Sequence, residues 1–398
     1  MPPVSLVHAC THLRPLGGVQ TLIRRHLRRD GDHGISSAAT IWFERGPFGP
    51  EASGCPVSGL GLRWFHSGRT LRRRLRAQTS ESIGDQRIWA YHDLWGLPTA
   101  ADLDGAARRI GVIHSQWEGT EPVLQTIRGV VDGMLCISAS SAELTAARLP
   151  QLADERIALL PVPVDPPPAS ALPWGPAPQE LVVGYCGRIR HQQKRVERIP
   201  EIASALRRAG VPHRWEFLGD GPDRVRLEKT LAATGANARF HGALSGDAYW
   251  KVLSAWDVIL FTSDYEGLPI AMLEAMSQGV VPVFPAIPCG GRDYAARVAP
   301  ELVYPASDLT AAARTLGWIQ SLDLPTRVQF RTRARDGVLA HTGDSYGKTL
   351  ASFLQHLVSL PRISASGQAA RRCHPGERVP YALIARLPPV HPLRRGYL

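Results

Sequence analysis

The sequence predicts an α/β protein built from two doubly wound parallel sheets, one in each half of the 398-residue chain. Short apolar runs alternate with helical patterns along the chain, and such runs are typical of buried parallel strands. A proline-rich stretch near the middle separates the halves, as a linker between domains does. The chain is long enough for two domains that each bury a core.

The apolar runs give candidate strands in both halves. The candidates of the first half are 4–8, 38–43, 87–91, 111–114 and 133–138. Those of the second half are 181–186, 214–218, 238–241, 257–262 and 280–284. Helical stretches between them complete βαβ units, and a series of such units produces a doubly wound sheet.

Residues 195–209 illustrate the helical period. Several apolar residues share one face of this stretch: Val196, Ile199, Ile202, Ala203 and Leu206. Arginine and glutamate occupy the other face, as in a helix that covers a sheet. Pro200 either kinks this helix or marks its first turn.

Composition divides the chain into segments. The prolines within 165–180 prevent helix or sheet there. We therefore predict a first domain (1–165), a linker (166–180), a second domain (181–342), a C-terminal helix (343–360) and a tail (361–398). The tail is rich in arginine and proline, so we expect it to be irregular or to wrap over the surface. The carboxyl ends of both sheets are expected to face a cleft between the domains.

The composition is that of an ordinary globular protein, with 44% hydrophobic and 20% charged residues. No apolar run is long enough for a membrane-spanning helix, and the first ten residues lack the pattern of a signal peptide. The six cysteines include no CxxC pair, which argues against a zinc site or a disulfide framework and for a reducing compartment. We expect a cytoplasmic protein.

The formal charge of +11 implies an anionic partner, unless it reflects an arginine-rich proteome. No RNA-binding signature or helix-turn-helix pattern is visible, so we expect no nucleic-acid partner. Residues 62–76 place tryptophan, phenylalanine and leucine among arginines. Such a stretch can lie peripherally on the anionic inner face of a membrane; the alternative is a solvated helix.

Two cations and two carboxylates carry the clearest functional signal. Arg188 and Lys194 lie in GYCGRIRHQQKR (184–195), on a strand-to-helix loop where cations suit a diphosphate. Glu266 and Glu274 follow another strand and suit the hydroxyls of a sugar and a ribose. Each residue alone could be a solvated side chain, but the four together predict a nucleotide-sugar site.

Backbone groups near these side chains complete the predicted donor site. Gly267, Leu268 and Pro269 lead into a helix over 270–278, whose first N–H groups would face a diphosphate. Glu274 is then on the Ile270 side of the helix. Gly219, in the turn GDGP, brings backbone to the same edge, although it can also be a simple turn.

The first domain offers weaker candidates. Gly17 and Gly18 follow the first strand and open a helix, where they either approach a phosphate or form a tight turn. His92 and His114 end two strands; we favour a functional role for His114 and a capping role for His92. The DxD at 102–104 resembles a metal-binding pair but sits in a predicted helix (99–108), so we interpret it as chance.

With these residues in place, the chain resembles family 4 of the retaining glycosyltransferases, which have the GT-B fold of two Rossmann-like domains. The matching pieces occur in the family's order over residues 4–358. They are GGVQ (17–20), IHS (113–115), CISAS (136–140), GRIRHQQKR (187–195), FLGDGP (217–222), FHG (240–242) and EGLPIAMLEAMSQGVVPV (266–283). The E-x7-E motif with the Gly-Arg…Lys element is the more specific part.

The resemblance implies a role for each matching residue. Arg188 and Lys194 would neutralise the diphosphate of the donor and of the leaving group. Glu274 would hold the ribose, and Glu266 would contact hydroxyls of the transferred sugar. The backbone of 267–270 would meet the sugar and the phosphate.

The resemblance extends to residues outside this motif. His114 would contact the transferred sugar, Gly18 would approach the phosphate or the acceptor, and Arg239–His241 would frame the base. Two departures leave the sugar preference open. The chain has PVPVD (161–165) where the family usually has Asn-Gly, and Asp293 stands where a glutamate is frequent.

These observations predict a retaining glycosyltransferase that moves a hexosyl group from a UDP-sugar. The acceptor, a glycan, a lipid or a small molecule, is not identified. No metal is expected, because two cations and a helix N-terminus can neutralise the diphosphate. The alternatives are a nucleotide-sugar epimerase or hydrolase of the same fold, and a non-catalytic sugar-nucleotide binding protein.

Overall fold

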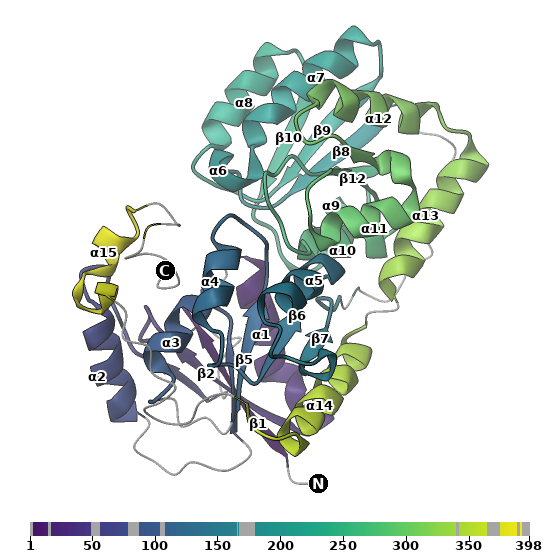
Figure 1. Ribbon diagram of the computed structural model, residues 1–398. Helices are drawn as coiled ribbons and strands as arrows, with labels where there is room; N and C mark the ends of the chain where they lie inside the picture. Colours follow the sequence, from purple (N-terminus) through teal and green to yellow (C-terminus); the bar gives the residue numbers. More distant parts are fainter. Residues whose placement is uncertain are drawn as a thin grey trace. The chain divides into compact units, whose positions relative to one another are not determined.

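The computed structural model describes residues 3–14, 17–48, 56–78, 87–103, 108–164, 166, 180–339, 342–363, 375–387 and 391. The chain forms two compact units (Figure 1). The first comprises Met1–Pro161 with Asp344–Leu398, and the second comprises Val162–Gly343. Helices pack around a parallel sheet in each unit, so the predicted doubly wound α/β class is confirmed.

The sheet of the first unit has seven parallel strands. In their order across the sheet they are β3 (Val57–Gly59), β2 (Ile35–Ile41), β1 (Val4–Cys10), β4 (Arg87–Tyr91), β5 (Arg108–Ile113), β6 (Gly133–Cys136) and β7 (Ile157–Leu159). The direction of winding reverses between β1 and β4. Open α/β sheets bind ligands beyond the carboxyl ends of the strands at such a switch point.

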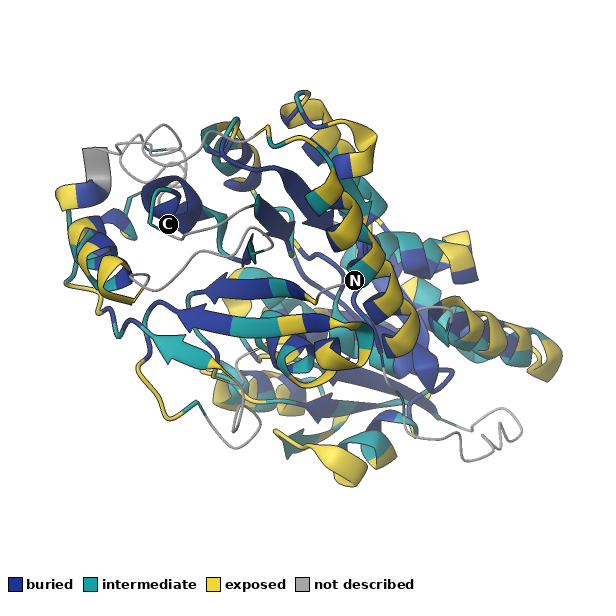
Figure 2. Ribbon diagram, turned by 90° about the horizontal axis from the view of Figure 1, so that it is seen from below, coloured by how far each residue is buried: buried dark blue, intermediate teal, exposed yellow. Residues whose placement is uncertain are grey.

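The helices of the first unit come from both ends of the chain. They are α1 (Gly18–Arg29), α2 (Gly68–Gln78), α3 (Leu97–Ala100), α4 (Thr120–Thr126), α5 (Ala139–Arg148), α14 (Gly343–Ser359) and α15 (Tyr381–Ile384), with the 3-10 turns η1 (Asp30–His33), η3 (Leu94–Gly96), η4 (Asp154–Arg156) and η8 (Pro375–Arg378). The strands are mostly buried, and the long helices expose one side (Figure 2).

The sheet of the second unit has six parallel strands and switches direction between β8 and β11. Across the sheet they are β10 (Asn237–Gly242), β9 (His213–Leu218), β8 (Leu181–Cys186), β11 (Val258–Leu260), β12 (Val281–Pro285) and β13 (Val303–Tyr304). Its helices are α6 (His191–Lys194), α7 (Ile199–Arg208), α8 (Arg224–Ala233), α9 (Gly246–Leu253), α10 (Ile270–Ser277), α11 (Gly290–Val298), α12 (Leu309–Ser321) and α13 (Leu324–Leu339), with the turns η5 (Val196–Arg198) and η6 (Pro300–Leu302).

Each predicted strand corresponds to an observed one, and β4 and β8 have the predicted bounds. Three edge or near-edge strands of two or three residues, β3, β7 and β13, were not predicted because they are too short to show a period. Pro200 lies in the first turn of α7, so it starts this helix rather than kinking it. The predicted helix over 99–108 is wrong, because α3 ends at Ala100 and Arg108 already begins β5.

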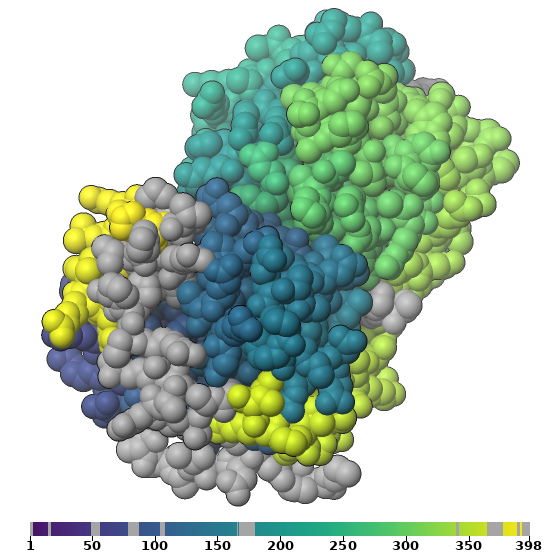
Figure 3. All heavy atoms as spheres, in the orientation of Figure 1, coloured from purple at the N-terminus to yellow at the C-terminus, as the bar shows by residue number. Residues whose placement is uncertain are grey.

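The C-terminal segment differs from its prediction. The helix predicted over 343–360 is α14, and it packs with the first unit although it follows the second in sequence (Figure 3). Within the tail, Tyr381 and Ile384 are fully buried, and the Tyr381 ring lies 5.4 Å from that of Phe43. This part is therefore core, although the apolar run 381–385 is too short to show a period within a tail rich in arginine and proline. Residues 364–374 of the tail and 167–179 of the linker lie outside the described residues.

Within the described ranges, no helix combines the length and the apolar character needed to cross a bilayer.

Candidate functional site

The carboxyl ends of β8 and β9 are joined by tightly packed backbone. The amide of Gly187 donates to the Leu218 carbonyl at 2.9 Å, and the amide of Gly219 donates to the Gly242 carbonyl at 2.8 Å. Gly219 has a φ of 120°, and a Cβ added there would lie 2.0 Å from the Gly187 carbonyl oxygen. Only glycine fits this position, which places the predicted Gly219 turn against the loop that carries Arg188.

Lys194 and Glu266 meet in a direct ion pair. Lys194 ends α6, after β8, and Glu266 follows β11, the neighbouring strand at the switch point. The Lys194 Nζ lies 2.6 Å from Glu266 Oε1, and the Ser263 hydroxyl donates to the same oxygen at 2.6 Å. Glu266 is only 5% exposed. Two side chains predicted to contact different parts of a donor are thus held by each other.

Further hydrogen bonds join the two loops around this ion pair. The Thr262 hydroxyl donates to the Lys194 carbonyl at 2.7 Å, and the Asp264 amide donates to the Gln193 carbonyl at 3.0 Å. Arg198 donates to the Thr262 carbonyl and pairs with Asp264 at 2.6 Å. These supporting residues were not predicted; their only signal is their closeness to Lys194 and Glu266 in sequence.

Glu274 lies on α10, and its carboxylate is bound by a tyrosine from α9. The Tyr249 hydroxyl donates to Glu274 Oε2 at 2.5 Å. Burial raises the pKa of Glu274, and the Tyr249 hydrogen bond partly opposes this. Tyr249 was missed because no spacing in the sequence connects it to Glu274.

The segment between the two glutamates leads directly into α10. Pro269 is the N-cap residue of this helix and Ile270 its first residue, as predicted. Leu268 is buried, and the Gly267 carbonyl accepts a hydrogen bond from the amide of Gly291 at 3.2 Å. The start of α11 therefore supports the loop that precedes α10.

The predicted donor-site residues of the second unit thus lie on the segments that follow β8, β9 and β11, except Arg239–His241, which belong to β10. The predicted glycines and histidines of the first unit form a separate group.

The first unit carries Gly17 and Gly18 at the start of α1 and His114 after β5. Gly17 is the N-cap residue of α1, with an extended backbone that any residue can adopt. His114 Nε2 lies 2.8 Å from His92 Nδ1, and His92 Nε2 lies 2.9 Å from His8 Nδ1. The three imidazoles form one hydrogen-bonded row across β5, β4 and β1, so His92 does more than cap a strand.

Burial keeps these imidazoles uncharged. It lowers the pKa of His114 to about 3 and that of His8 to about 4, and it lowers the pKa of His92 well below its usual value. Neighbouring histidines add to each of these shifts. His114 can therefore act as a neutral hydrogen-bonding group.

Asp102 of the DxD element is paired with an arginine. Its carboxylate binds the Arg72 guanidinium in a bidentate ion pair, at 2.7 and 2.8 Å. Asp104 lies outside the described residues.

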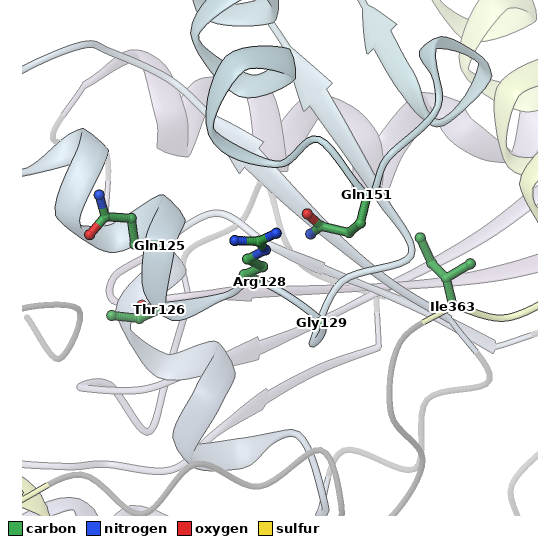
Figure 4. Close-up of a pocket in the computed structure, with 6 residues that line it drawn as sticks. All are labelled: Gln125, Thr126, Arg128, Gly129, Gln151 and Ile363. Carbon is green, nitrogen blue, oxygen red and sulfur yellow. The ribbon is translucent and has the colours of Figure 1, made fainter.

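An open cavity of about 650 Å³ lies in the first unit (Figure 4). Its lining residues come from the end of α4, from the loops after α4 and α5, and from the start of the tail: Gln125, Thr126, Arg128, Gly129, Gln151 and Ile363. None of them is a predicted site residue, so the sequence motifs do not account for this cavity.

Comparisons with known proteins identify the family. The family model described as "Glycosyl transferases group 1" matches residues 173–337. A 2-deoxystreptamine glucosyltransferase of Streptomyces kanamyceticus is 30% identical over 312 residues, which cover 69% of this chain and 77% of the relative. A 2-deoxystreptamine N-acetyl-D-glucosaminyltransferase of Streptomyces fradiae is 31% identical over 194 residues, 47% of this chain and 44% of the relative.

The solved structures agree with the fold. Anabaena Alr3699/HepE in complex with UDP superposes with a TM-score of 0.69 at 13% identity, covering 88% of this chain and 99% of that one. Such a likeness supports two Rossmann-like domains of the GT-B class. Since a relative at 30% identity is matched over most of its length, the chain belongs to the glycosyl transferases group 1 family and is a glycosyltransferase.

Proposed function

We propose that the protein is a retaining glycosyltransferase whose donor is a UDP-sugar. The contact between Lys194 and Glu266 carries this proposal, because it places a cation for phosphate beside a carboxylate for sugar hydroxyls. The Anabaena protein, which has a similar fold, was solved in complex with UDP and with UDP-glucose, and this supports the choice of nucleotide. Family 4 of the retaining enzymes is the class that these motifs resemble.

In this proposal, catalysis is mainly electrostatic. Arg188 and Lys194 stabilise the charge that develops on the departing diphosphate, and the first turn of α10 adds its N–H groups. Glu274 binds the ribose, and Glu266 and His114 contact the transferred sugar. Gly17 and Gly18 allow the backbone at the start of α1 to approach the phosphate or the acceptor.

We propose a polar amino-alcohol as the acceptor. Two relatives act on 2-deoxystreptamine, and one of them is matched over 77% of its length. Acceptor contacts in such folds come from loops that vary freely, so this assignment needs a direct test.

A two-step experiment tests the donor and the acceptor. First, thermal unfolding is measured with UDP-glucose, UDP-N-acetylglucosamine and GDP-mannose, because a bound donor raises the melting temperature. The stabilising donor is then incubated with 2-deoxystreptamine, and the product is analysed by mass spectrometry and NMR. An α-linked product supports retention. Rapid turnover without acceptor would favour an epimerase or hydrolase, and binding without turnover would favour a binding protein.

We predict that Glu274 and Glu266 act on different parts of the donor. Glu274→Ala should weaken binding of UDP itself, because the ribose is present with or without sugar. Tyr249→Phe should do so more mildly, since it removes the hydroxyl that holds the carboxylate. Glu266→Ala should mainly reduce turnover of the sugar nucleotide. Titration calorimetry with UDP measures the affinity of each variant. Equal loss of UDP affinity in Glu274→Ala and Glu266→Ala would contradict the proposal that the two glutamates act on different parts of the donor.

We predict that sugar transfer does not depend on added Mg²⁺ or Mn²⁺. Arg188, Lys194 and the α10 N-terminus supply the positive potential that a metal supplies elsewhere. Initial rates of the enzyme as purified should be unchanged when either ion is added to a buffer that contains no other divalent metal. A large activation by Mg²⁺ or Mn²⁺ would show that the diphosphate needs a metal after all.

We propose peripheral membrane contact through 62–76, on a smaller surface than the sequence indicated. Leu71 and Leu75 are fully buried, so this apolar side of α2 faces the core rather than a bilayer. Trp64 and Phe65 remain exposed, at 48% and 69%. Exposed arginines accompany them: Arg63, Arg69, Arg73 and Arg76.

We predict that the protein sediments with anionic vesicles at low salt and is released as salt rises, because screening removes the attraction. The variant Trp64→Ser/Phe65→Ser should sediment less. Equal binding to neutral and anionic vesicles, or binding to neither, would leave 62–76 as a solvated surface.

A further inference from the structure

A buried cluster of three residues of metal-binding types lies where β1 meets α1 and η1 in the first unit. His8 is on β1, His26 on α1 and Asp30 begins η1, and each is at most 4% exposed. One donor atom from each lies within 4.8 Å of the others. His26 Nδ1 is 3.1 Å from both Asp30 oxygens, and His8 Nε2 is 3.9 Å from Asp30 Oδ2. The three groups converge on one point.

His8 provides a second, independent observation. Its Nδ1 lies 2.9 Å from His92 Nε2, and this hydrogen bond fixes the orientation of the ring through the nitrogen that does not face the cluster. Its Nε2 is buried and has no hydrogen-bond partner among the residues that the structure describes. A buried polar atom without a partner is uncommon and calls for an explanation.

The other two residues are also supported from outside the cluster. His26 Nε2 lies 3.1 Å from the Tyr346 hydroxyl of α14, and the Ser37 hydroxyl donates to Asp30 Oδ2. Metal-bound histidines characteristically use their second ring nitrogen in this way, and bound carboxylates are likewise hydrogen-bonded. The cluster thus has the surroundings of a metal site as well as its donor atoms.

We propose that His8 Nε2, His26 Nδ1 and the Asp30 carboxylate bind one Zn²⁺ ion. Bonds of about 2.0–2.2 Å in a tetrahedron place ligand atoms roughly 3.3 Å apart. The two separations from Asp30, 3.1 Å to His26 and 3.9 Å to His8, lie on either side of this value, and all three ligand atoms lie within 4.8 Å of one another. Two imidazoles and a carboxylate suit zinc. A cavity of about 10 Å³ adjoins His8, His26 and Tyr346, and apart from His92 its other lining residues are apolar. This volume is about that of one water, which would find its polar partners on the histidine and tyrosine side of the cavity.

The ion would set the protons along the histidine row. With zinc on Nε2, His8 carries its proton on Nδ1 and donates it to His92 Nε2. His92 then carries its proton on Nδ1 and donates to His114 Nε2, which leaves His114 with an Nδ1–H. This makes His92 and His8 positioning residues for His114. The value of that proton to a bound sugar rests on the proposed function, whereas the zinc site does not.

The test uses the full chain without a polyhistidine tag, and without donor or acceptor. Mass spectrometry of the metal content should find about one zinc per chain. Removing the zinc with a chelator should lower the melting temperature, and adding Zn²⁺ should restore it. Co²⁺ in its place should give the visible absorption of a tetrahedral site, a readout that needs no variant to fold. In zinc-loaded protein, ¹⁵N NMR should show His114 protonated on Nδ1.

His8→Ala and Asp30→Asn should lose the zinc, and His92→Phe should weaken binding by roughly 10–100-fold. His213→Ala, which changes a histidine on β9 of the second unit, should keep it. Folded wild-type protein that neither contains nor responds to zinc would overturn the proposal and leave a His26–Asp30 ion pair. Retention of zinc by both ligand variants would overturn it too, because the ion would then lie elsewhere.

Discussion

Lys194→Ala is expected to lower kcat/KM by about 10² or more, the size of effect seen when one preorganised charge is lost from a transition state. Its ammonium pairs with Glu266, which in turn follows the strand next to β8. The cation is therefore held in place before a donor binds, and no reorganisation is needed when charge develops on the leaving diphosphate. Arg188→Ala should lower kcat/KM by a similar factor. Steady-state kinetics with the donor identified by thermal unfolding measures both.

Two controls separate this charge effect from a loss of folding. Lys229→Ala removes an exposed lysine of α8 and should leave kcat/KM unchanged. Lys194→Ala also leaves the buried Glu266 carboxylate without its cation, so it should lower stability. Lys194→Met/Glu266→Gln removes both charges and should recover stability but not activity. Near-normal kcat/KM in folded Lys194→Ala and Arg188→Ala would remove the assigned role.

Gly219→Ala is expected to reduce the free energy of unfolding by about 2–4 kcal/mol. The residue has a φ of 120°, where side chains are strained, and the new Cβ would lie 2.0 Å from the Gly187 carbonyl oxygen. The collision is with backbone, which cannot rotate away, so the loop that carries Arg188 must shift. Donor affinity should fall together with stability, as measured by denaturant unfolding and by titration with UDP.

The matched control is Gly337→Ala on α13, in the same unit. A Cβ there meets nothing within 4 Å, so the change should be neutral or should stabilise by about 0.5–1 kcal/mol. If Gly219→Ala unfolded at the wild-type denaturant concentration, the close approach of the two loops would not exist in solution.

The parts of the fold that could be predicted are those with a local signal. β4 and β8 are short, continuous and apolar, and their bounds follow from the sequence alone. The start of α10 could be predicted for a similar reason, since Pro269 can precede a helix but not continue one. The burial of Tyr381 and Ile384 has no such signal. They belong to a run of five apolar residues (381–385) that is too short to show a period within a tail rich in arginine and proline, yet both are fully buried.

The residues of the predicted site likewise separate into those with a local sequence signal and those without one. Arg188, Lys194, Glu266 and Glu274 could be proposed as donor-site residues, because the segments that carry them follow strands in a recurrent spacing. The partner of Glu274 could not, because Tyr249 approaches from another helix. No spacing in the sequence indicates the cluster of His8, His26 and Asp30 either, because these side chains come together only when α1 packs on β1.

The two doubly wound sheets, the family motifs and the charged residues can be read from the sequence, because periodicity, turn residues and charge are properties of short segments. Which of these charged side chains touch depends on how the strands are arranged in the folded chain. Lys194 and Glu266 form a pair because β8 and β11 are neighbours in the sheet. The histidine row exists because β1, β4 and β5 lie side by side. Strand order depends on burying the whole sheet at once, and no short segment encodes it.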